Sequence, residues 1–357
     1  MSIRVLLVED SPIALSILKR MLESSPEIEI VGTATTGVEA LAILAHIRPD
    51  VMCTDFFMPH MNGLELTSQV MTHNPLPILV ISGSVQEDDS QRIFQLLEAG
   101  AVDVCPKPIV GLSAQNSVFK QSLIDKVKVL SGVKVFRKKR SLFLKRQNSN
   151  GTTPQVPETI PSYRPRIVAV GASTGGPMAL QELLGQLPRE FPLPIVCVQH
   201  ISSGFLEGLI SWLETTCRLP IQIAPLGERP QPGTIYFPPE RQHLLIDSRG
   251  RFLHSQDPPV DGHCPSVTQT FISLAEFYGR RTVGILLTGM GRDGADGMRA
   301  IAEAGGLTIA QDEATSVVFG MPKEAIALGA ARHILPIQSI TPTLLKLVQA
   351  CAPNSIR

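Results

Sequence analysis

Ser173 lies in a glycine-rich turn whose sequence suits nucleophilic chemistry. The stretch Gly171–Gly175 reads GASTG and matches G-x-S-x-G, in which glycines let the backbone turn sharply and expose the serine hydroxyl. A turn of this kind also fits phosphate or dinucleotide binding at a helix N-terminus. The next predicted strand favours the first option, because it ends in Gln199-His200 where a dinucleotide site places an acidic residue. A histidine is the base that an unactivated serine requires.

A third segment, TVGILLTGMGRDGADG, supplies an acid for the same site. Asp293 and Asp296 both lie in its loop, and a buried carboxylate bonded to the second imidazole nitrogen would fix the histidine tautomer and stabilise the imidazolium. The glycines around Met290 leave backbone N–H groups free to bind an oxyanion. The chain order Ser, His, Asp differs from that of α/β-hydrolases, chymotrypsin and subtilisin, so these residues are identified by role.

A second set of reactive residues lies near the N-terminus, at the ends of predicted strands. It comprises Glu9, Asp10, Asp55, Ser82 and Lys107. The carboxyl ends of parallel strands line one crevice, so these side chains are expected to converge. Three carboxylates repel one another unless a hard cation lies among them, and Mg²⁺ prefers oxygen ligands. An aspartate beside such a metal can accept a phosphoryl group, whose oxygens the hydroxyl and the ammonium would hold.

Two sets of strands would position these residues. Short apolar runs alternate with amphipathic helical patterns, which is typical of parallel sheets in α/β domains. Ser11 is predicted to cap the first helix, with Pro12 as its first residue. The predicted strands of the first set are Arg4–Val8, Glu29–Val31, Val51–Thr54, Ile78–Ile81 and Val102–Cys105. Those of the second set begin at Arg166 and continue with Ile195–Gln199, Ile221–Ala224, Thr234–Phe237, His243–Ile246, Thr282–Leu287 and Leu307–Ala310.

The sequence between the two sets has a different composition. Phe136–Arg146 is basic, and the stretch after it is rich in Pro, Ser, Thr and Asn. This composition indicates an interdomain linker, and its basic start reads as solvated chain in preference to a site for an acidic partner. We therefore expect domains at residues 1–125 and 165–352, joined by a linker at 126–164.

Bulk composition narrows the class of protein. The 357 residues are 43% hydrophobic with zero formal net charge, which suits a two-domain globular protein and favours neither nucleic acid nor an anionic membrane as partner. The six cysteines are scattered without C-x-x-C spacing, so we expect reduced thiols and no zinc site. An acidic pair soon interrupts the apolar start MSIRVLLVED, which is not a signal peptide, and no apolar run approaches the length of a membrane span. A cytoplasmic location without membrane insertion is expected.

The ordered motifs VEDS, TDFFMPHMNG, ISGS and CPKP resemble the receiver domains of two-component response regulators. The resemblance implies that Asp55 is the phosphoacceptor, that Asp10 with Glu9 holds Mg²⁺, and that the Phe57 carbonyl is a third ligand. Receivers usually carry an aromatic switch residue three positions before the lysine, where this chain has Val104. The residue type at this position therefore does not indicate how phosphorylation is relayed.

The whole chain resembles the CheB family of chemotaxis protein-glutamate methylesterases. The motifs are GASTGGP, QH, YFPPERQHLL, HCPSVTQTF, LLTGMGRDGA and VFGMPKEA. The resemblance implies two doubly wound parallel-sheet α/β domains, a flavodoxin-like receiver and a Rossmann-like methylesterase domain. It further implies Ser173 as nucleophile, His200 as base, Asp293 as orienting acid, Met290 N–H as oxyanion donor and a supporting Thr174. Matching motifs also contain His243 and His263, for which packing is the expected role.

The resemblance also implies a substrate and partners. CheB proteins hydrolyse methyl-glutamate on the cytoplasmic helices of chemoreceptors, releasing methanol, and many deamidate receptor glutamines; a chemotaxis histidine kinase donates the phosphoryl group. We expect a monomer that needs Mg²⁺ for receiver phosphorylation only, with no cofactor for the esterase. Ile201–Phe205 and Thr268 depart from the family pattern, which bears on receptor preference more than on chemistry. An alternative is a phospho-regulated adaptor whose esterase domain only binds a partner, against which the intact triad argues.

Overall fold

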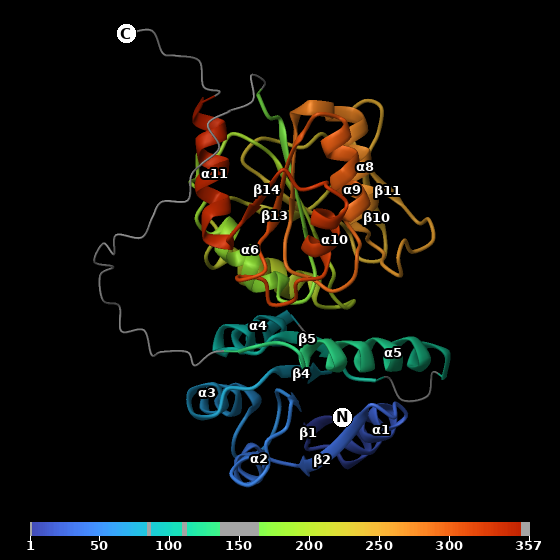
Figure 1. The fold of residues 1–357 in the computed structure, drawn as a ribbon, viewed down its shortest axis with the longest axis vertical. Coiled ribbons are helices and arrows are strands. Elements are labelled where there is room, and N and C mark those ends of the chain that lie inside the picture. Colours follow the sequence, from blue (N-terminus) through green and yellow to red (C-terminus); the bar gives the residue numbers. More distant parts are fainter. Residues whose placement is uncertain (1, 84–86, 109–112, 136–163, 351–357) are drawn as a thin grey trace, which may run out of the picture. The chain divides into compact units, whose positions relative to one another are not determined.

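A computed structural model describes residues 2–83, 87–108, 113–135 and 164–350. The chain forms two compact units, which are described in turn (Figure 1). The basic stretch at Phe136–Arg146 and the predicted linker after it, up to residue 163, lie outside the described residues.

The first unit is a five-stranded parallel sheet with the order β2-β1-β3-β4-β5 and helices packed on it. Ser11 caps α1, with its hydroxyl accepting from the Ala14 N–H, and Pro12 is the first helical residue, as predicted. The elements are β1 (Ile3–Val8), α1 (Pro12–Glu23), β2 (Ile28–Ala34), α2 (Gly37–Leu44), β3 (Val51–Thr54), α3 (Gly63–His73), β4 (Ile78–Ser82), α4 (Glu87–Ala99), β5 (Asp103–Pro106) and α5 (Ser113–Leu130). Helix α5 continues past the expected boundary at residue 125.

The second unit is a seven-stranded parallel sheet with the order β14-β13-β12-β6-β7-β9-β8. Its elements are β6 (Ile167–Ala172), α6 (Gly176–Leu184), β7 (Ile195–Gln199), α7 (Leu206–Glu214), β8 (Ile221–Ile223), β9 (Ile235–Phe237), β10 (His243–Ile246), β11 (Phe252–Ser255), α8 (Val267–Tyr278), β12 (Thr282–Leu286), α9 (Ala295–Glu303), β13 (Leu307–Gln311), α10 (Met321–Ala327), β14 (His333–Leu335) and α11 (Ile337–Ala350). A short 3₁₀ turn at Gly279–Arg281 leads into β12.

The centre of this sheet is apolar on both faces. All six residues of β6 and all five of β12 are buried, as expected for parallel strands covered by helices on both sides. The chain leaves β6 toward β7 on one side, and β12 pairs with β6 on the other. The carboxyl ends of β12, β6 and β7 therefore flank a topological switch point, where doubly wound sheets place their sites.

The predicted fold class and most predicted strands are confirmed, and the differences lie at the margins of the second sheet. Strand β10 was predicted, but it pairs antiparallel with β11 in a separate hairpin. Strands β11 and β14 had no prediction, because each is a run of three or four residues with polar members and a weak apolar pattern.

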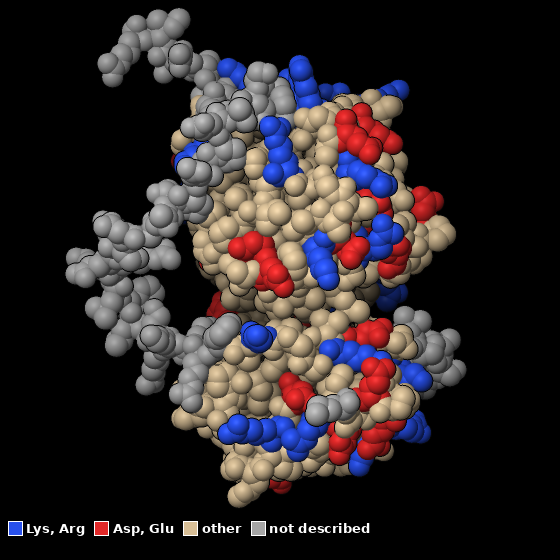
Figure 2. Space-filling view, in the orientation of Figure 1, with Lys and Arg blue, Asp and Glu red and all other residues tan. Residues whose placement is uncertain are grey.

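On the face shown in Figure 2, acidic and basic side chains are interspersed over both units, in keeping with a net charge of zero. Of the helices that the structure describes, none combines the length and apolarity needed to cross a bilayer.

Candidate active site

Ser173 lies in the turn between β6 and α6, directly after the last residue of the strand. Its backbone N–H donates to the Thr288 carbonyl at 3.0 Å, and its own carbonyl accepts from the Gly176 N–H at 2.7 Å. Gly175 has φ 76°, and a Cβ there would lie 2.6 Å from the Val317 side chain. The turn that presents Ser173 thus requires glycine at this position.

His200 lies beside Ser173, across the pairing of β6 with β7. Ala172 pairs with Gln199 in the sheet, so the residues that follow them are neighbours at the carboxyl edge. The buried Gln199 side chain links their backbones, because its Nε2 donates to the carbonyls of Ser173 and His200, each at 2.8 Å. Gln199 belongs to the sequence motif QH, but no local pattern indicates that its side chain turns back toward the serine.

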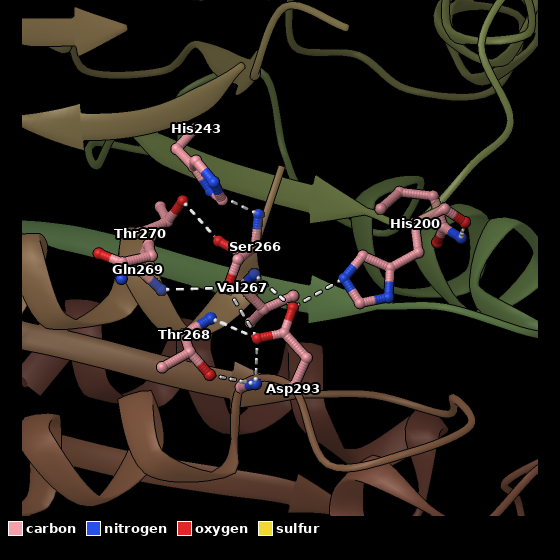
Figure 3. A network of polar contacts seen from close by, with 10 residues as sticks. His200, His243, Ser266, Val267, Thr268, Gln269, Thr270 and Asp293 are labelled. Carbon is pink, nitrogen blue, oxygen red and sulfur yellow. Dashed lines mark hydrogen bonds and ion pairs between the residues drawn. The ribbon is translucent and has the colours of Figure 1, made fainter. Parts of the chain in front are cut away.

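Asp293 is fully buried and accepts five hydrogen bonds. Its Oδ2 accepts from His200 Nε2 and Val267 N, both at 2.8 Å. Its Oδ1 accepts from Ser266 Oγ at 2.8 Å and from the backbone N–H groups of Thr268 and Gly294, both at 2.9 Å (Figure 3). Burial alone would raise the pKa of Asp293, but the hydrogen bond and charge of His200 and the Thr268 N–H outweigh burial and hold it below its usual range.

The same contacts determine which nitrogen of His200 can act as a base. An ionised Asp293 offers no proton, so Nε2 carries the proton of the neutral ring and donates it to Oδ2. Nδ1 then has the free lone pair, and this buried atom has no hydrogen-bond partner within the part of the chain that the structure describes. The arrangement therefore supplies an unprotonated nitrogen on a residue whose strand neighbours that of Ser173.

The start of α8 holds the carboxylate in place. Ser266 is the N-cap residue, so the free N–H groups and dipole of the helix favour an anion at this end. The buried His243 Nδ1 accepts from the Ser266 N–H at 3.1 Å, so this histidine supports the cap as well as packing. Thr268 is buried beside Asp293, and its Oγ1 accepts from Gly294 N at 2.7 Å. Thr268 therefore supports the acid, and its effect on receptor preference stays a prediction.

The rival carboxylate Asp296 has other partners. It forms ion pairs with Arg292 at 2.8 Å and Arg299 at 2.9 Å on the surface of the unit. Asp293 is the residue of this loop that meets His200.

The loop after β12 approaches Ser173 closely at Gly289. A Cβ there would lie 2.7 Å from the Ser173 Cβ and 2.2 Å from Met321 Sδ. The Gly289 N–H is bonded to the Val318 carbonyl, whereas the Met290 N–H that follows donates to no protein group in the described residues. Thr174 is buried in the same corner, with its carbonyl accepting from Thr288 Oγ1 at 2.9 Å. A free N–H beside a serine is what an oxyanion site needs.

The N-terminal unit brings together the second predicted set of residues. Lys107 Nζ bonds Asp55 Oδ2 at 2.7 Å and Glu9 Oε1 at 2.8 Å. Burial raises the pKa of both carboxyls, and Lys107 offsets this only in part. Burial lowers the Lys107 pKa, but its two carboxylate partners outweigh burial and raise it.

The same cluster has the donor set of a magnesium site. Oxygens of Glu9, Asp10 and Asp55 lie within 4.8 Å of one another, and the buried Glu9 Oε2 has no partner in the described residues. The buried Ser82 Oγ also lacks a hydrogen-bond partner there. Phe57 lines a hollow beside Asp10, at the same edge of the sheet. An acidic pocket with unused oxygens fits Mg²⁺.

Val104, where an aromatic switch residue is usual, is buried in β5. The neighbouring Asp103 forms an ion pair with Lys126 of α5. This ion pair links β5 to α5 at the residue next to Val104.

The second unit has the construction of a serine hydrolase on a doubly wound sheet, and the first unit has that of a response-regulator receiver. Two family models match accordingly: the response regulator receiver domain over residues 5–114 and the CheB methylesterase over residues 168–344. A protein-glutamate methylesterase/protein-glutamine glutaminase of Nitrosospira multiformis is 41% identical over 97% of both chains, and one of Geobacter metallireducens is 40% identical over 97% of this chain and 99% of its own. The catalytic domain of Thermotoga maritima CheB methylesterase superposes with a TM-score of 0.50 and 38% identity, covering 53% of this chain and all of that one. The chain belongs to the CheB family of response-regulator methylesterases.

Proposed function

We propose that this protein hydrolyses glutamate methyl esters on the cytoplasmic helices of chemoreceptors, releasing methanol, and deamidates receptor glutamines. The single observation that carries the proposal is the His200 ring, which is bonded through Nε2 to a buried carboxylate and keeps Nδ1 unbonded, on the residue that follows the strand paired with the one before Ser173. The family relationship supplies the substrate class.

The proposed reaction proceeds through an acyl-enzyme. His200 Nδ1 takes the Ser173 proton as Oγ attacks the ester carbonyl, and Asp293 stabilises the imidazolium. The Met290 N–H binds the oxyanion, a contribution of about 3 kcal/mol per donor in serine hydrolases. The imidazolium then protonates the departing methoxide, and methanol leaves. Water repeats the sequence on the acyl-enzyme and releases glutamate; with a glutamine substrate the leaving group is ammonia.

A small hollow lies at Gln199, the residue before His200. It is lined in part by Ile201 and Ser203, which belong to the segment that departs from the family pattern. Ser203 Oγ accepts from Arg241 Nε at 3.0 Å, and the Gly204 N–H donates to Glu240 at 2.7 Å. We propose that this segment sets receptor preference.

Release of methanol from methylated receptor, measured with the full chain and a small phosphodonor, tests the assignment. Ser173→Ala should abolish it, and unchanged turnover would refute the proposed nucleophile. Mass spectrometry of the receptor helices should show which glutamates lose methyl groups and which glutamines lose ammonia.

We further propose that the receiver, at residues 1–125, regulates the esterase domain at 165–352, to which the linker at 126–164 joins it. Asp55 accepts the phosphoryl group from a histidine kinase, with Mg²⁺ held by Glu9, Asp10, Asp55 and the Phe57 carbonyl; Lys107 and Ser82 bind the phosphoryl oxygens. When bound, Mg²⁺ neutralises charge on the transferring group. Phosphorylation biases a two-state equilibrium that controls access to the esterase.

The regulatory proposal has a direct test. We compare the esterase rate of the full chain, with and without phosphodonor, against a chain that starts near Pro165. Equal rates in all three would rule out regulation by the receiver.

A further inference from the structure

His263 packs flat against His200. The two ring centroids are 3.8 Å apart and the planes differ by 8°. One face of the His200 ring is therefore covered, while its edges carry the bond to Asp293 and the free Nδ1. Stacking of this kind limits rotation of the covered ring about its side-chain bonds, because rotation would drive its edge into the neighbour.

A tight turn places His263. The Val260 and His263 backbones exchange two hydrogen bonds, at 2.9 and 3.0 Å, around Asp261 and Gly262. These central residues have φ of 50° and 81°, the conformation of a type I′ turn, for which Asp-Gly is a preferred sequence. The ring is thus attached to a well-defined piece of backbone.

The same short segment also holds Asp293. Three residues beyond His263 the chain reaches Ser266, whose hydroxyl donates to Asp293 Oδ1, and then Val267, whose N–H donates to Oδ2. One continuous stretch of chain, residues 260–268, therefore contacts the base on its ring face and the acid on both of its oxygens.

The charge of His263 suits a place beside a base. Burial, then repulsion by His200, lowers the pKa of His263 to about 4; Asp293 and Asp261 oppose this only in part. At neutral pH His263 is uncharged, so an imidazolium that forms on His200 meets a neutral aromatic face and not a second cation.

The same three residues do not suit a metal ion, although His200, His263 and Asp293 have ligand atoms within 4.8 Å. A nitrogen lone pair lies in the plane of its ring, so two nearly parallel stacked rings direct their lone pairs along parallel planes that do not meet at one ion.

We propose that His263 is a positioning residue for the hydrolytic reaction, holding the His200 ring by stacking in the orientation that bonds Nε2 to Asp293 and leaves Nδ1 available to the nucleophile. The proposal rests on the proposed esterase function. It assigns the role to the flat face of His263 and not to its proton.

Two substitutions distinguish a role for the flat His263 ring from a role for its titratable proton. His263→Leu keeps bulk but loses the flat ring, and kcat for methanol release should fall by about 30-fold with KM changed by less than about twofold, because the base is misplaced while substrate contacts remain. His263→Phe restores a flat ring without a titratable group and should return kcat to within about threefold of the parent. His333→Ala, a partly buried histidine on β14 far along the sheet, is the matched control and should leave kcat unchanged.

The assays use the full chain with a small phosphodonor, and thermal unfolding confirms that each variant is folded. Equal kcat for His263→Leu and His263→Phe, whether both fast or both slow, would overturn the stacking role. Turnover that survives Ser173→Ala would instead overturn the esterase assignment, so the two failures are distinguishable.

Discussion

Replacing Asp293 by Asn should prevent His200 from acting as a base, because it changes which ring nitrogen carries the proton. All five groups that meet the carboxylate are hydrogen donors: His200 Nε2, Ser266 Oγ and three backbone N–H groups. A carboxamide has one oxygen, which the three donors around Oδ1 will claim. Its NH₂ then faces Nε2, which must give up its proton and become the acceptor, so the proton moves to Nδ1 and the base is lost.

The size of the effect follows from that change. The corresponding Asp→Asn substitution in chymotrypsin-like proteases lowers kcat about ten-thousandfold by the same tautomer error, which corresponds to roughly 5 kcal/mol of transition-state stabilisation. We expect a loss of about 10³- to 10⁴-fold here. The Val267 N–H is also left facing a donor, so the free energy of unfolding should fall by about 1–3 kcal/mol.

The assay is the initial rate of methanol release from methylated receptor, at a temperature where urea titration shows Asp293→Asn to be folded. Asp296→Asn is the control, since it makes the same chemical change at a surface carboxylate paired with arginines on the same loop, and it should stay within about twofold of the parent. A folded Asp293→Asn protein that loses less than about tenfold would refute the tautomer argument.

Three further predictions concern the surroundings of both sites. Gln199→Leu removes the donor to the His200 carbonyl and one of the two donors to the Ser173 carbonyl, so urea titration should show unfolding made easier by about 1–3 kcal/mol, with kcat lowered as well; unchanged stability would contradict this linking role of Gln199. Gly289→Ala places a methyl group against the Ser173 Cβ and should lower kcat about 100-fold; turnover near that of the parent would show that the loop has room to yield. Because burial raises the pKa of Asp55 and Glu9, the folded receiver binds their protons more tightly than the unfolded chain, so its stability should decrease as pH rises through the raised values. Mg²⁺ should restore stability at neutral pH, and Asp55→Asn should weaken that effect, as followed by thermal unfolding; a midpoint insensitive to Mg²⁺ would contradict the site.

The sequence predicted what depends on local patterns. Both parallel sheets follow from apolar runs, and the residues at strand ends follow from the rule that those ends share an edge. Asp55 and Lys107 lie far apart in the chain, yet their meeting needed only the order of the strands.

The support of the site could not be predicted in this way. Ser266 has the residue type of a helix cap, but no local pattern says that the cap faces Asp293 from another part of the fold. Asp-Gly before His263 signals a tight turn, but the ring on which His263 stacks depends on side-chain packing between distant segments. Such contacts are set by tertiary geometry, which neither propensity nor periodicity encodes.

The order of the strands determines which imidazole nitrogen is the base. Ser173 follows β6, between His200, which follows β7, and Asp293, which lies beyond β12. The His200 ring must therefore reach Ser173 nearby and also extend past it to Asp293. In an imidazole, Nδ1 is attached next to the side-chain stem and Nε2 lies at the far side, so the near atom faces the adjacent strand and the far atom reaches the next. A hydrolase that places its acid behind the histidine instead needs the opposite ring orientation. Sheet topology thus determines which histidine nitrogen bonds the acid and which one acts as the base. Unrelated folds with the same three catalytic residues can therefore use different nitrogens.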